Sequence, residues 1–397
     1  MSLESELPLA GSLDPTRLER ARASALPAAF YTSQAVHALE LTALFASHWL
    51  CIGREEDLPE PGSFLTREIG RERILIVRDR DGTLRAFFNV CRHRGSRLVD
   101  ADCGTGLRRI TCPYHAWTYE LDGRFSSAPW LDEDFDKPAY SLRALPLGSF
   151  GGFLFVNLDA RAAPLESWLA DLPDLSRFRL TELRRGHRET YDLEANWKLV
   201  CENFSECYHC ALAHPQLNRL SDSRSGGQLL SGRCFNGGPM SLNEGIESLT
   251  MSGRSRNRPI PGLAAEDHRT VHYFVVYPNL LLSLHADYVL VHTVWPRGAE
   301  RTRVVCEWLF TAEALATADF DAGDAVAFWD LTNRQDWQLC ERVQRGVRSA
   351  GYAPGPYHSS EHCVHAFDQW YAGVIAPHLP AQARSAPPRA AAAQAAR

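Results

Sequence analysis

The chain has 397 residues, of which 45% are hydrophobic and 23% charged, and its formal net charge is −6. This composition is typical of a folded globular protein with two or more domains, and it excludes collagen, coiled coils and general disorder. The basic residues form no run or stripe, so we expect no nucleic-acid binding. There is no apolar run long enough to cross a membrane and no signal-peptide pattern. We therefore expect a soluble, cytoplasmic protein without membrane contact, whose eleven cysteines serve as thiols and metal ligands rather than a disulfide framework.

The first region is predicted to be small and mostly β. Residues 1–30 form an N-terminal arm that we expect to be loosely held, and 35–50 have apolar positions at helical spacing. The runs 73–77 and 84–90 predict a hairpin, and further strands are expected at 108–112, 116–121 and 152–158. We assign residues 31–165, including the leading helix, to this domain.

The second region, 166–379, is larger and predicts an α+β domain built around an antiparallel sheet. The stretch 164–190 is helix-capable, and helices are expected at 195–212 and 324–349. Strands are expected at 272–277, 279–285, 288–295 and 302–310. The stretch 221–265, rich in Gly, Ser, Arg and Pro, predicts a long loop of the kind that often carries function. The tail 380–397 has low complexity and is predicted to be disordered.

Two tight Cys/His pairs lie in the first domain: Cys91 with His93, and Cys112 with His115. Two thiolates and two imidazoles make a mixed metal-ligand set, and a structural zinc site is one interpretation. Each pair, however, supplies one residue of each type, which suits a two-iron cluster in which one iron takes both thiolates and the other both imidazoles. Neutral histidine ligands raise the reduction potential of such a cluster, so it accepts electrons readily.

The run NVCRHRGSRLVDADCGTGLRRITCPYHAWTYELDGR at 89–124 resembles an oxygenase-type Rieske [2Fe-2S] domain. Rieske proteins of respiratory complexes carry an additional cysteine in each cluster loop, and the two form a disulfide. Here Cys103 lies between the loops, so that disulfide is not expected. The resemblance implies that Cys91, His93, Cys112 and His115 hold the cluster.

A second set of metal-ligand residues lies in the predicted helix at 195–212 and just beyond it. Glu206 and His209 are three residues apart and would share a helix face, and His214 follows where Pro215 indicates the helix end. Two histidines and one carboxylate leave coordination positions open for dioxygen and substrate, as in non-haem Fe(II) oxygenases. The predicted helix at 324–349 offers three carboxylates, among which spacing does not choose: Asp330, Asp336 and Glu341.

The run NWKLVCENFSECYHCALAHP at 196–215 resembles the catalytic domain of Rieske non-haem iron oxygenase α subunits, and QDWQLCERVQRG at 335–346 resembles their third-ligand helix. The resemblance implies a helix-grip-like antiparallel sheet holding mononuclear Fe(II) through His209, His214 and Asp336. It also implies that Glu206 bridges the two metal centres. Most ring-hydroxylating members have Asp at the bridge, and Glu206 is similar to the subgroup acting on choline, carnitine, glycine betaine and stachydrine.

The resemblance further implies an enzyme that uses O2 and electrons from a separate NAD(P)H-dependent ferredoxin/flavin-type reductase. It would hydroxylate or N-demethylate a small organic substrate, with a betaine-like quaternary ammonium compound favoured. Electrons would pass from His115 of one subunit to Glu206 of a neighbour, within a homotrimer. Two alternatives stay open: an aromatic-ring hydroxylase or dioxygenase, and a Rieske electron carrier without catalysis.

A quaternary ammonium group would be held by aromatic faces through cation–π attraction. Aromatic residues at alternate strand positions are more often core residues, so the sequence offers candidates without choosing among them. The candidates are Phe204, Phe235, Tyr273, Phe274, Tyr277, Tyr288 and Trp295.

Overall fold

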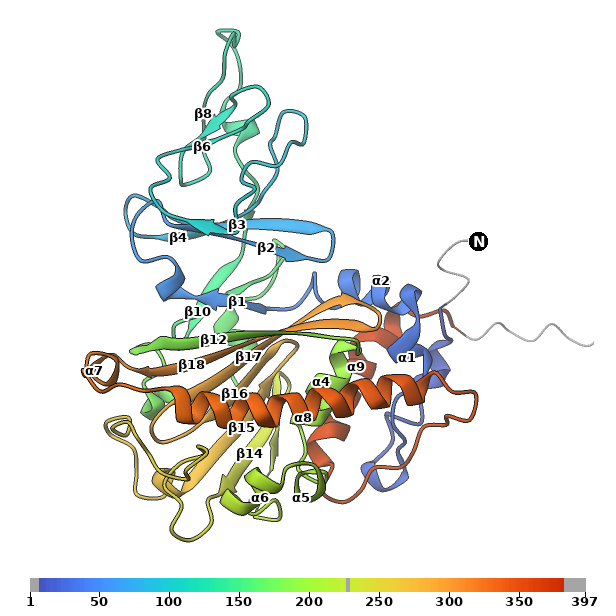
Figure 1. Cartoon of the computed structure of the whole chain (residues 1–397). Helices are drawn as coiled ribbons and strands as arrows, with labels where there is room; N and C mark the ends of the chain where they lie inside the picture. Colours follow the sequence, from blue (N-terminus) through green and yellow to red (C-terminus); the bar gives the residue numbers. More distant parts are fainter. Residues whose placement is uncertain (1–6, 226–228, 382–397) are drawn as a thin grey trace, which may run out of the picture.

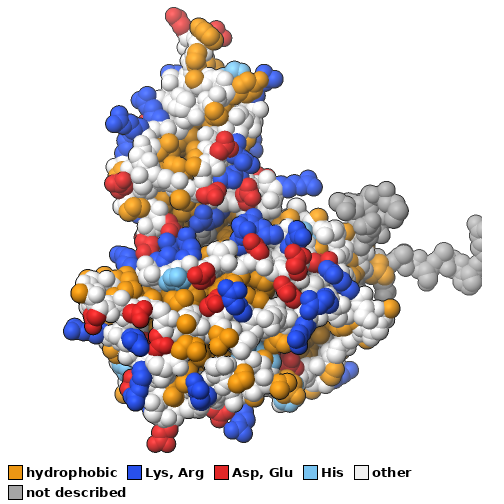
Figure 2. All heavy atoms as spheres, in the orientation of Figure 1, with side chains coloured by type: hydrophobic (Ala, Val, Ile, Leu, Met, Phe, Trp, Pro, Cys, Tyr) orange, Lys and Arg blue, Asp and Glu red, His pale blue; other side chains and the backbone are white. Residues whose placement is uncertain are grey.

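The computed structural model describes residues 7–225 and 229–381, which form a narrow β domain standing on a larger α+β domain (Figure 1). The predicted α+β class is confirmed. Most of the predicted disordered tail lies outside the described residues. Basic and acidic side chains are interspersed on the face in Figure 2. Within the described residues, no helix is long and apolar enough to cross a bilayer.

The β domain contains three antiparallel sheets. The first, in the order β1-β11-β10, consists of β1 (Leu50–Arg54), β11 (Phe153–Val156) and β10 (Leu147–Phe150). The second, in the order β5-β2-β3-β4-β9, consists of β5 (Cys103–Gly104), β2 (Phe64–Ile69), β3 (Glu72–Arg78), β4 (Leu84–Phe88) and β9 (Ala144–Leu145). The third, in the order β6-β7-β8, consists of β6 (Ile110–Thr111), β7 (Thr118–Tyr119) and β8 (Phe125–Ser127). The predicted hairpin is confirmed as β3 and β4.

The larger domain is built on a seven-stranded antiparallel sheet in the order β12-β18-β17-β16-β15-β14-β13. Its strands are β12 (Leu183–Leu193), β18 (Arg301–Thr311), β17 (Val289–Gly298), β16 (Leu280–Leu284), β15 (Thr270–Val276), β14 (Phe235–Ser241) and β13 (Leu230–Ser231). The α-helices are α1 (Ala29–Thr32), α2 (Gln34–Ala43), α3 (Leu165–Trp168), α4 (Trp197–Phe204), α5 (Cys210–Ala213), α6 (Pro215–Leu220), α7 (Ala312–Leu315), α8 (Gly323–Val347) and α9 (His362–Ile375). Short 3₁₀ segments are η2 (Ala10–Leu13), η3 (Arg20–Arg22), η4 (Glu55–Asp57), η5 (Pro138–Tyr140), η6 (Ser176–Phe178), η7 (Asp267–Arg269) and η8 (Ala376–His378).

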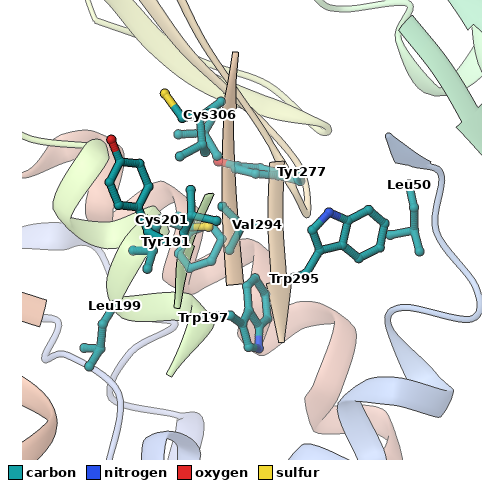
Figure 3. Close-up of a cluster of buried hydrophobic side chains, with 14 of the residues drawn as sticks. Leu50, Tyr191, Trp197, Leu199, Cys201, Tyr277, Val294, Trp295 and Cys306 are labelled. Atoms are coloured by element: carbon teal, nitrogen blue, oxygen red, sulfur yellow. The ribbon is translucent and has the colours of Figure 1, made fainter. Parts of the chain in front are cut away.

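The central strands are apolar on both faces because each face of the sheet covers a separate core. Along β16, Leu281 belongs to the core that includes Trp197 of α4 and residues of α8, whereas Leu280 and Leu282 belong to the core shared with β1 and β11. This division follows from the two-residue period of side chains along a strand. Figure 3 shows the first core, where Trp197 lies close to Val294. The sheet is therefore held between α4, α8 and α9 on one face and the base of the β domain on the other.

The prediction of helix over 164–190 is wrong for most of that stretch, because only the short segments α3 and η6 are helical and residues from Leu183 onward form β12. Exposed and more buried positions alternate along β12, as a half-buried strand requires. Its Arg188 pairs with Glu307 of β18, and Asp192 pairs with Arg303 of the same strand. Cross-strand ion pairs therefore accommodate the charged residues of β12 in the sheet.

The prediction of a loosely held arm is also wrong for the described residues 7–26. Leu13 and Leu26 are fully buried, and the backbone N–H of Ala10 donates to Pro380 O at 3.0 Å. Helix α2 continues this attachment, because Glu40 accepts hydrogen bonds from Trp197 and Tyr371 at 3.0 and 2.6 Å. The arm and the leading helix thus pack on the larger domain.

Candidate metal centres

The two Cys/His pairs lie on neighbouring loops at the end of the β domain far from α5 and α6 (Figure 1). Cys91 and His93 follow β4, and Cys112 and His115 lie between β6 and β7. In each loop, the N–H of the fourth residue after the cysteine donates to the cysteine carbonyl: Gly95 to Cys91 and Ala116 to Cys112, both at 3.1 Å. Gly95 and Ala116 both have left-handed φ values, 73° and 56°. The two loops therefore share the same turn geometry after their cysteines.

The two imidazole rings of this set lie close together. The rings of His93 and His115 are 4.8 Å apart between centroids, and both thiols are buried. Nδ1 of His115 is buried and has no hydrogen-bond partner in the described part of the chain, as expected of an atom reserved for a metal. The donor set and this unpaired nitrogen fit a two-iron cluster with mixed ligands.

Aromatic side chains support the loops in ways the sequence did not reveal. The Trp117 ring stacks on His93 at 4.8 Å with an interplanar angle of 5°. The Tyr119 hydroxyl lies 3.4 Å from Cys91 Sγ and accepts a hydrogen bond from the Arg92 N–H at 3.0 Å. Hydrogen bonds to cluster sulfurs tune the reduction potential, so Tyr119 is placed to do so.

In the larger domain, α4 ends at Phe204, and the prediction of one helix over 195–212 is wrong. Residues 205–209 form a turn before the short helix α5. The turn is closed locally, because the Ser205 hydroxyl donates to Cys201 O at 2.7 Å and the Glu206 carboxylate accepts from the N–H groups of Tyr208 and His209. These bonds replace those of a continuing helix.

Glu206 still reaches His209, although through the turn rather than along a helix face. Its Oε1 contacts Nδ1 of His209. His209 then precedes α5, and His214 precedes α6, whose first residue is Pro215. The two histidines are thereby directed to one point from the starts of two consecutive short helices.

Asp336 of α8 meets these histidines. Its Oδ1 lies 2.9 Å from His214 Nε2 and 3.2 Å from His209 Nε2, and the two Nε2 atoms are 3.2 Å apart. The other two carboxylates are engaged elsewhere. Asp330 accepts from Tyr191 at 2.8 Å and from Arg334 at 2.8 Å, and Glu341 accepts from the Glu194 N–H at 3.2 Å. Of the three candidates, the structure brings only Asp336 to the histidines.

The electrostatics of this cluster favour a bound cation. Burial acts to lower the pKa of His209, but hydrogen bonds to Asp336 and Glu206 raise it to about 10. Burial acts to raise the pKa of Asp336, but the same imidazoles hold it below its usual value. Two carboxylates around two imidazoles thus stabilise positive charge at one point. A bound metal ion would supply that positive charge in place of a proton.

A cavity of about 1010 Å³ opens beside this point. Phe204, Tyr273 and Trp329 supply aromatic rings to its lining, and Phe204 and Tyr273 meet edge to face at 6.0 Å. Tyr208 and His358 also line it, and their rings stack at 4.3 Å, with Tyr208 62% exposed. Part of the predicted loop at 221–265 lines the cavity as well, but the same stretch also contributes β13 and β14 to the sheet.

Of the seven aromatic candidates, only Phe204 and Tyr273 line the cavity. The others belong to the two cores: Phe235, Phe274, Tyr277, Tyr288 and Trp295. Trp329 was not among the candidates, although it lies seven residues before Asp336. Two helical turns separate the two residues, so they share one face of α8.

One pair of cysteines departs from the expectation of free thiols: Cys207 and Cys210 form a disulfide across His209. The remaining cysteines are free, and most are buried. The four-residue segment that carries His209 is therefore closed covalently as well as through Glu206.

Two family models match the chain: the Rieske [2Fe-2S] domain over residues 48–146 and the ring hydroxylating alpha subunit (catalytic domain) over residues 180–376. The chain belongs to the Rieske non-haem iron oxygenases, whose α subunits combine a [2Fe-2S] cluster with a mononuclear iron. It is thus an enzyme, the oxygenase component of a system that needs a separate reductase.

Individual members of the family are similar to this chain over most of their length. The chain is 34% identical to the glycine betaine monooxygenase oxygenase subunit of Chromohalobacter salexigens, over 95% of this chain and 92% of the relative. It is 33% identical to the carnitine monooxygenase oxygenase subunit of Acinetobacter baumannii, over 82% of this chain and 86% of that relative. A solved structure of the quaternary ammonium Rieske monooxygenase CntA matches 93% of this chain and 99% of that chain, with 28% identity and a TM-score of 0.76.

Proposed function

We propose that this chain hydroxylates an N-methyl group of a small quaternary ammonium compound and thereby removes it. The observation that carries the proposal is the meeting of His209, His214 and Asp336 at the wall of a cavity lined by aromatic rings. The names of the relatives point to the same substrate class, since they act on glycine betaine and carnitine.

His209, His214 and Asp336 are the proposed iron ligands, and they form a set of two imidazoles and one carboxylate with open positions. When bound, the iron supplies the oxygen-activating chemistry. The carboxylate of Glu206 holds the Nδ1 side of His209, leaving Nε2 for the metal. Cys91 and Cys112 would hold one iron of the cluster, and His93 and His115 the other.

The cavity supports the choice of a cationic substrate. The rings of Phe204, Tyr273 and Trp329 offer negative π faces to a trimethylammonium group. Glu206 and Asp222 also line the cavity, as does Arg224, which forms an ion pair with Asp222 at 3.2 Å. A cation therefore gains electrostatic attraction from the aromatic faces, whereas an uncharged arene would gain only apolar contact with them.

The proposed reaction balances as follows. One oxygen atom of O2 enters a C–H bond of the N-methyl group, and the other leaves as water after uptake of two electrons and two protons. NAD(P)H supplies the electrons through a ferredoxin/flavin-type reductase. The resulting carbinolamine then breaks its C–N bond, releasing formaldehyde and a proton and leaving the electron pair on the amine nitrogen.

We further propose that the working form is a homotrimer in which the cluster of one chain faces the iron of the next. Within one chain, the cluster loops and α5 lie at opposite ends of the molecule (Figure 1). Apolar side chains are exposed at both ends: Tyr114 is 57% exposed beside His115, and Leu212 is 91% exposed near His209. In a quaternary ammonium Rieske monooxygenase of known structure to which this chain is similar, inter-subunit electron transfer has been described.

Substrate screening tests the proposed reaction. With a reductase supplied, we expect a quaternary ammonium compound such as glycine betaine, carnitine or choline to yield one formaldehyde per NADH oxidised. Naphthalene serves as the arene control. A cis-diol from naphthalene without formaldehyde from any betaine would establish the ring-dioxygenase alternative, and a protein without mononuclear iron would establish the electron carrier.

A mixing experiment tests the trimer. Cys112→Ser removes a proposed cluster ligand and Asp336→Ala a proposed iron ligand, so each homotrimer should be inactive. Co-expressed chains should regain activity, because a cluster from one chain can serve the iron of another. Failure to regain activity in mixed trimers, shown by tagged purification and light scattering, would contradict transfer between chains.

A further inference from the structure

Gln335 and Asp336 are consecutive residues of α8, and they hold opposite edges of one histidine ring. Gln335 Oε1 lies 2.8 Å from His214 Nδ1, and Asp336 Oδ1 lies 2.9 Å from His214 Nε2. The ring between them is 1% exposed. Its orientation is therefore set by two neighbouring positions of one 25-residue helix.

The contact with Gln335 selects a tautomer. An amide oxygen only accepts hydrogen bonds, so His214 must carry its proton on Nδ1 and donate it to Gln335. Nε2 then keeps its lone pair and faces the position where Asp336 and His209 converge. In the opposite tautomer the proton lies on Nε2, so Nδ1 has no proton to donate to the amide oxygen.

The two histidines are supported differently. His209 has a carboxylate at Nδ1, from Glu206, whereas His214 has the neutral amide of Gln335. A second carboxylate at this place would add negative charge beside the half-buried Asp336. The neutral amide orients the ring without that added charge.

We propose that Gln335 is a positioning residue that holds His214 in the tautomer and orientation needed to bind iron. The proposal rests on the proposed function, because it takes His214 as an iron ligand. A role confined to helix packing would make no demand on the amide oxygen. The two roles therefore predict different results when the oxygen is removed without a change in side-chain length.

The test compares Gln335→Met, which keeps the length and loses the strong acceptor, with Gln335→Glu, which keeps an acceptor. Gln338→Met is the matched control, since Gln338 is an exposed residue of the same helix. The dissociation constant for Fe(II) is measured anaerobically by chelator competition, and the visible spectrum of the Co(II)-loaded protein reports ligand geometry. The visible spectrum of the cluster and the unfolding temperature monitor folding.

We expect Gln335→Met to weaken Fe(II) binding by roughly 10- to 100-fold and to change the Co(II) spectrum, as loss of a partner to a ligating histidine typically does. Gln335→Glu should restore binding to within a few-fold, and Gln338→Met should match the unaltered protein. Unaltered Fe(II) affinity in Gln335→Met would overturn the proposal, as would equal weakening in Gln335→Glu. If Gln335→Met fails to fold, Gln335→Leu takes its place as the variant without an acceptor. Its Fe(II) affinity and Co(II) spectrum are then compared with those of Gln335→Glu. Absence of Fe(II) binding in the unaltered protein would instead overturn the proposed iron site.

Discussion

The Glu206 carboxylate contacts Nδ1 of His209, while Nε2 of the same ring lies 3.2 Å from Asp336. One imidazole thus connects the exposed turn after α4 to the buried end of the cavity. Because the turn also carries the exposed Tyr208, Glu206 lies between the protein surface and the proposed iron site. This placement is what an electron-transfer bridge from a neighbouring chain requires.

Glu206→Gln should therefore slow electron transfer without loss of metal. We expect turnover to fall by roughly 10- to 100-fold, since the carboxylate that orients and polarises His209 becomes a neutral amide. Single-turnover oxidation of the reduced cluster, followed by visible absorbance, measures the step directly. Coupled turnover at the normal rate would remove Glu206 from the pathway.

Asp336→Ala should abolish binding of the mononuclear iron and leave the cluster spectrum unchanged. Asp336 supplies the only carboxylate of the three candidates that reaches both histidines in the described structure. Asp330→Ala is the control, because its carboxylate bonds Tyr191 and Arg334 instead. Metal analysis of both variants measures the mononuclear iron that each retains. Iron retained in Asp336→Ala and lost in Asp330→Ala would make Asp330 the third ligand instead of Asp336.

Tyr273→Leu should raise KM for the quaternary ammonium substrate by roughly 2- to 30-fold, the range expected for loss of one cation–π contact. Tyr273→Phe keeps the aromatic face and should stay close to the unaltered protein. Inhibition by an uncharged tert-butyl analogue of the substrate should respond less to the Leu substitution. If the Leu substitution weakens the binding of the charged and uncharged compounds equally, Tyr273 contributes shape rather than cation–π attraction.

A pair of carboxylates, the half-buried Glu202 and the buried Asp368, makes stability depend on pH. Burial raises the pKa of Glu202 to about 7, against the opposing effects of Tyr31 and Lys198, and burial together with Glu202 raises that of Asp368 well above its ordinary value. Between pH 4.5 and about 7, the folded state holds more protons than the unfolded chain, so the free energy of unfolding falls as pH rises.

Glu202→Gln removes the charge and should make the protein more stable at pH 8 by on the order of 2 kcal/mol, with little difference at pH 4. Thermal or urea unfolding across this range measures the effect. Glu244→Gln, at an exposed position, should leave the pH profile unchanged. Identical profiles for the two variants would show that folding does not raise the pKa of Glu202.

Several features could be predicted from the chain alone because they depend on short separations. The pairs at 91–93 and 112–115, and the histidines at 209 and 214, are each close in sequence. Backbone turns bring such residues together whatever the rest of the fold does. Four strands of the central sheet, β15 to β18, were likewise predicted, since runs of apolar residues and alternating patterns report burial directly.

The family resemblance implied Asp336, but only the tertiary structure placed Asp336, and not Asp330 or Glu341, at the histidines, because that contact depends on how α8 packs over the sheet. A helix turn moves a side chain to a different neighbour, and no local pattern records which neighbour is met. The same packing placed Gln335 on His214, turned Trp329 into the cavity and buried the N-terminal arm. Sequence thus determined which residue types could bind metal, and long-range packing decided which of them meet.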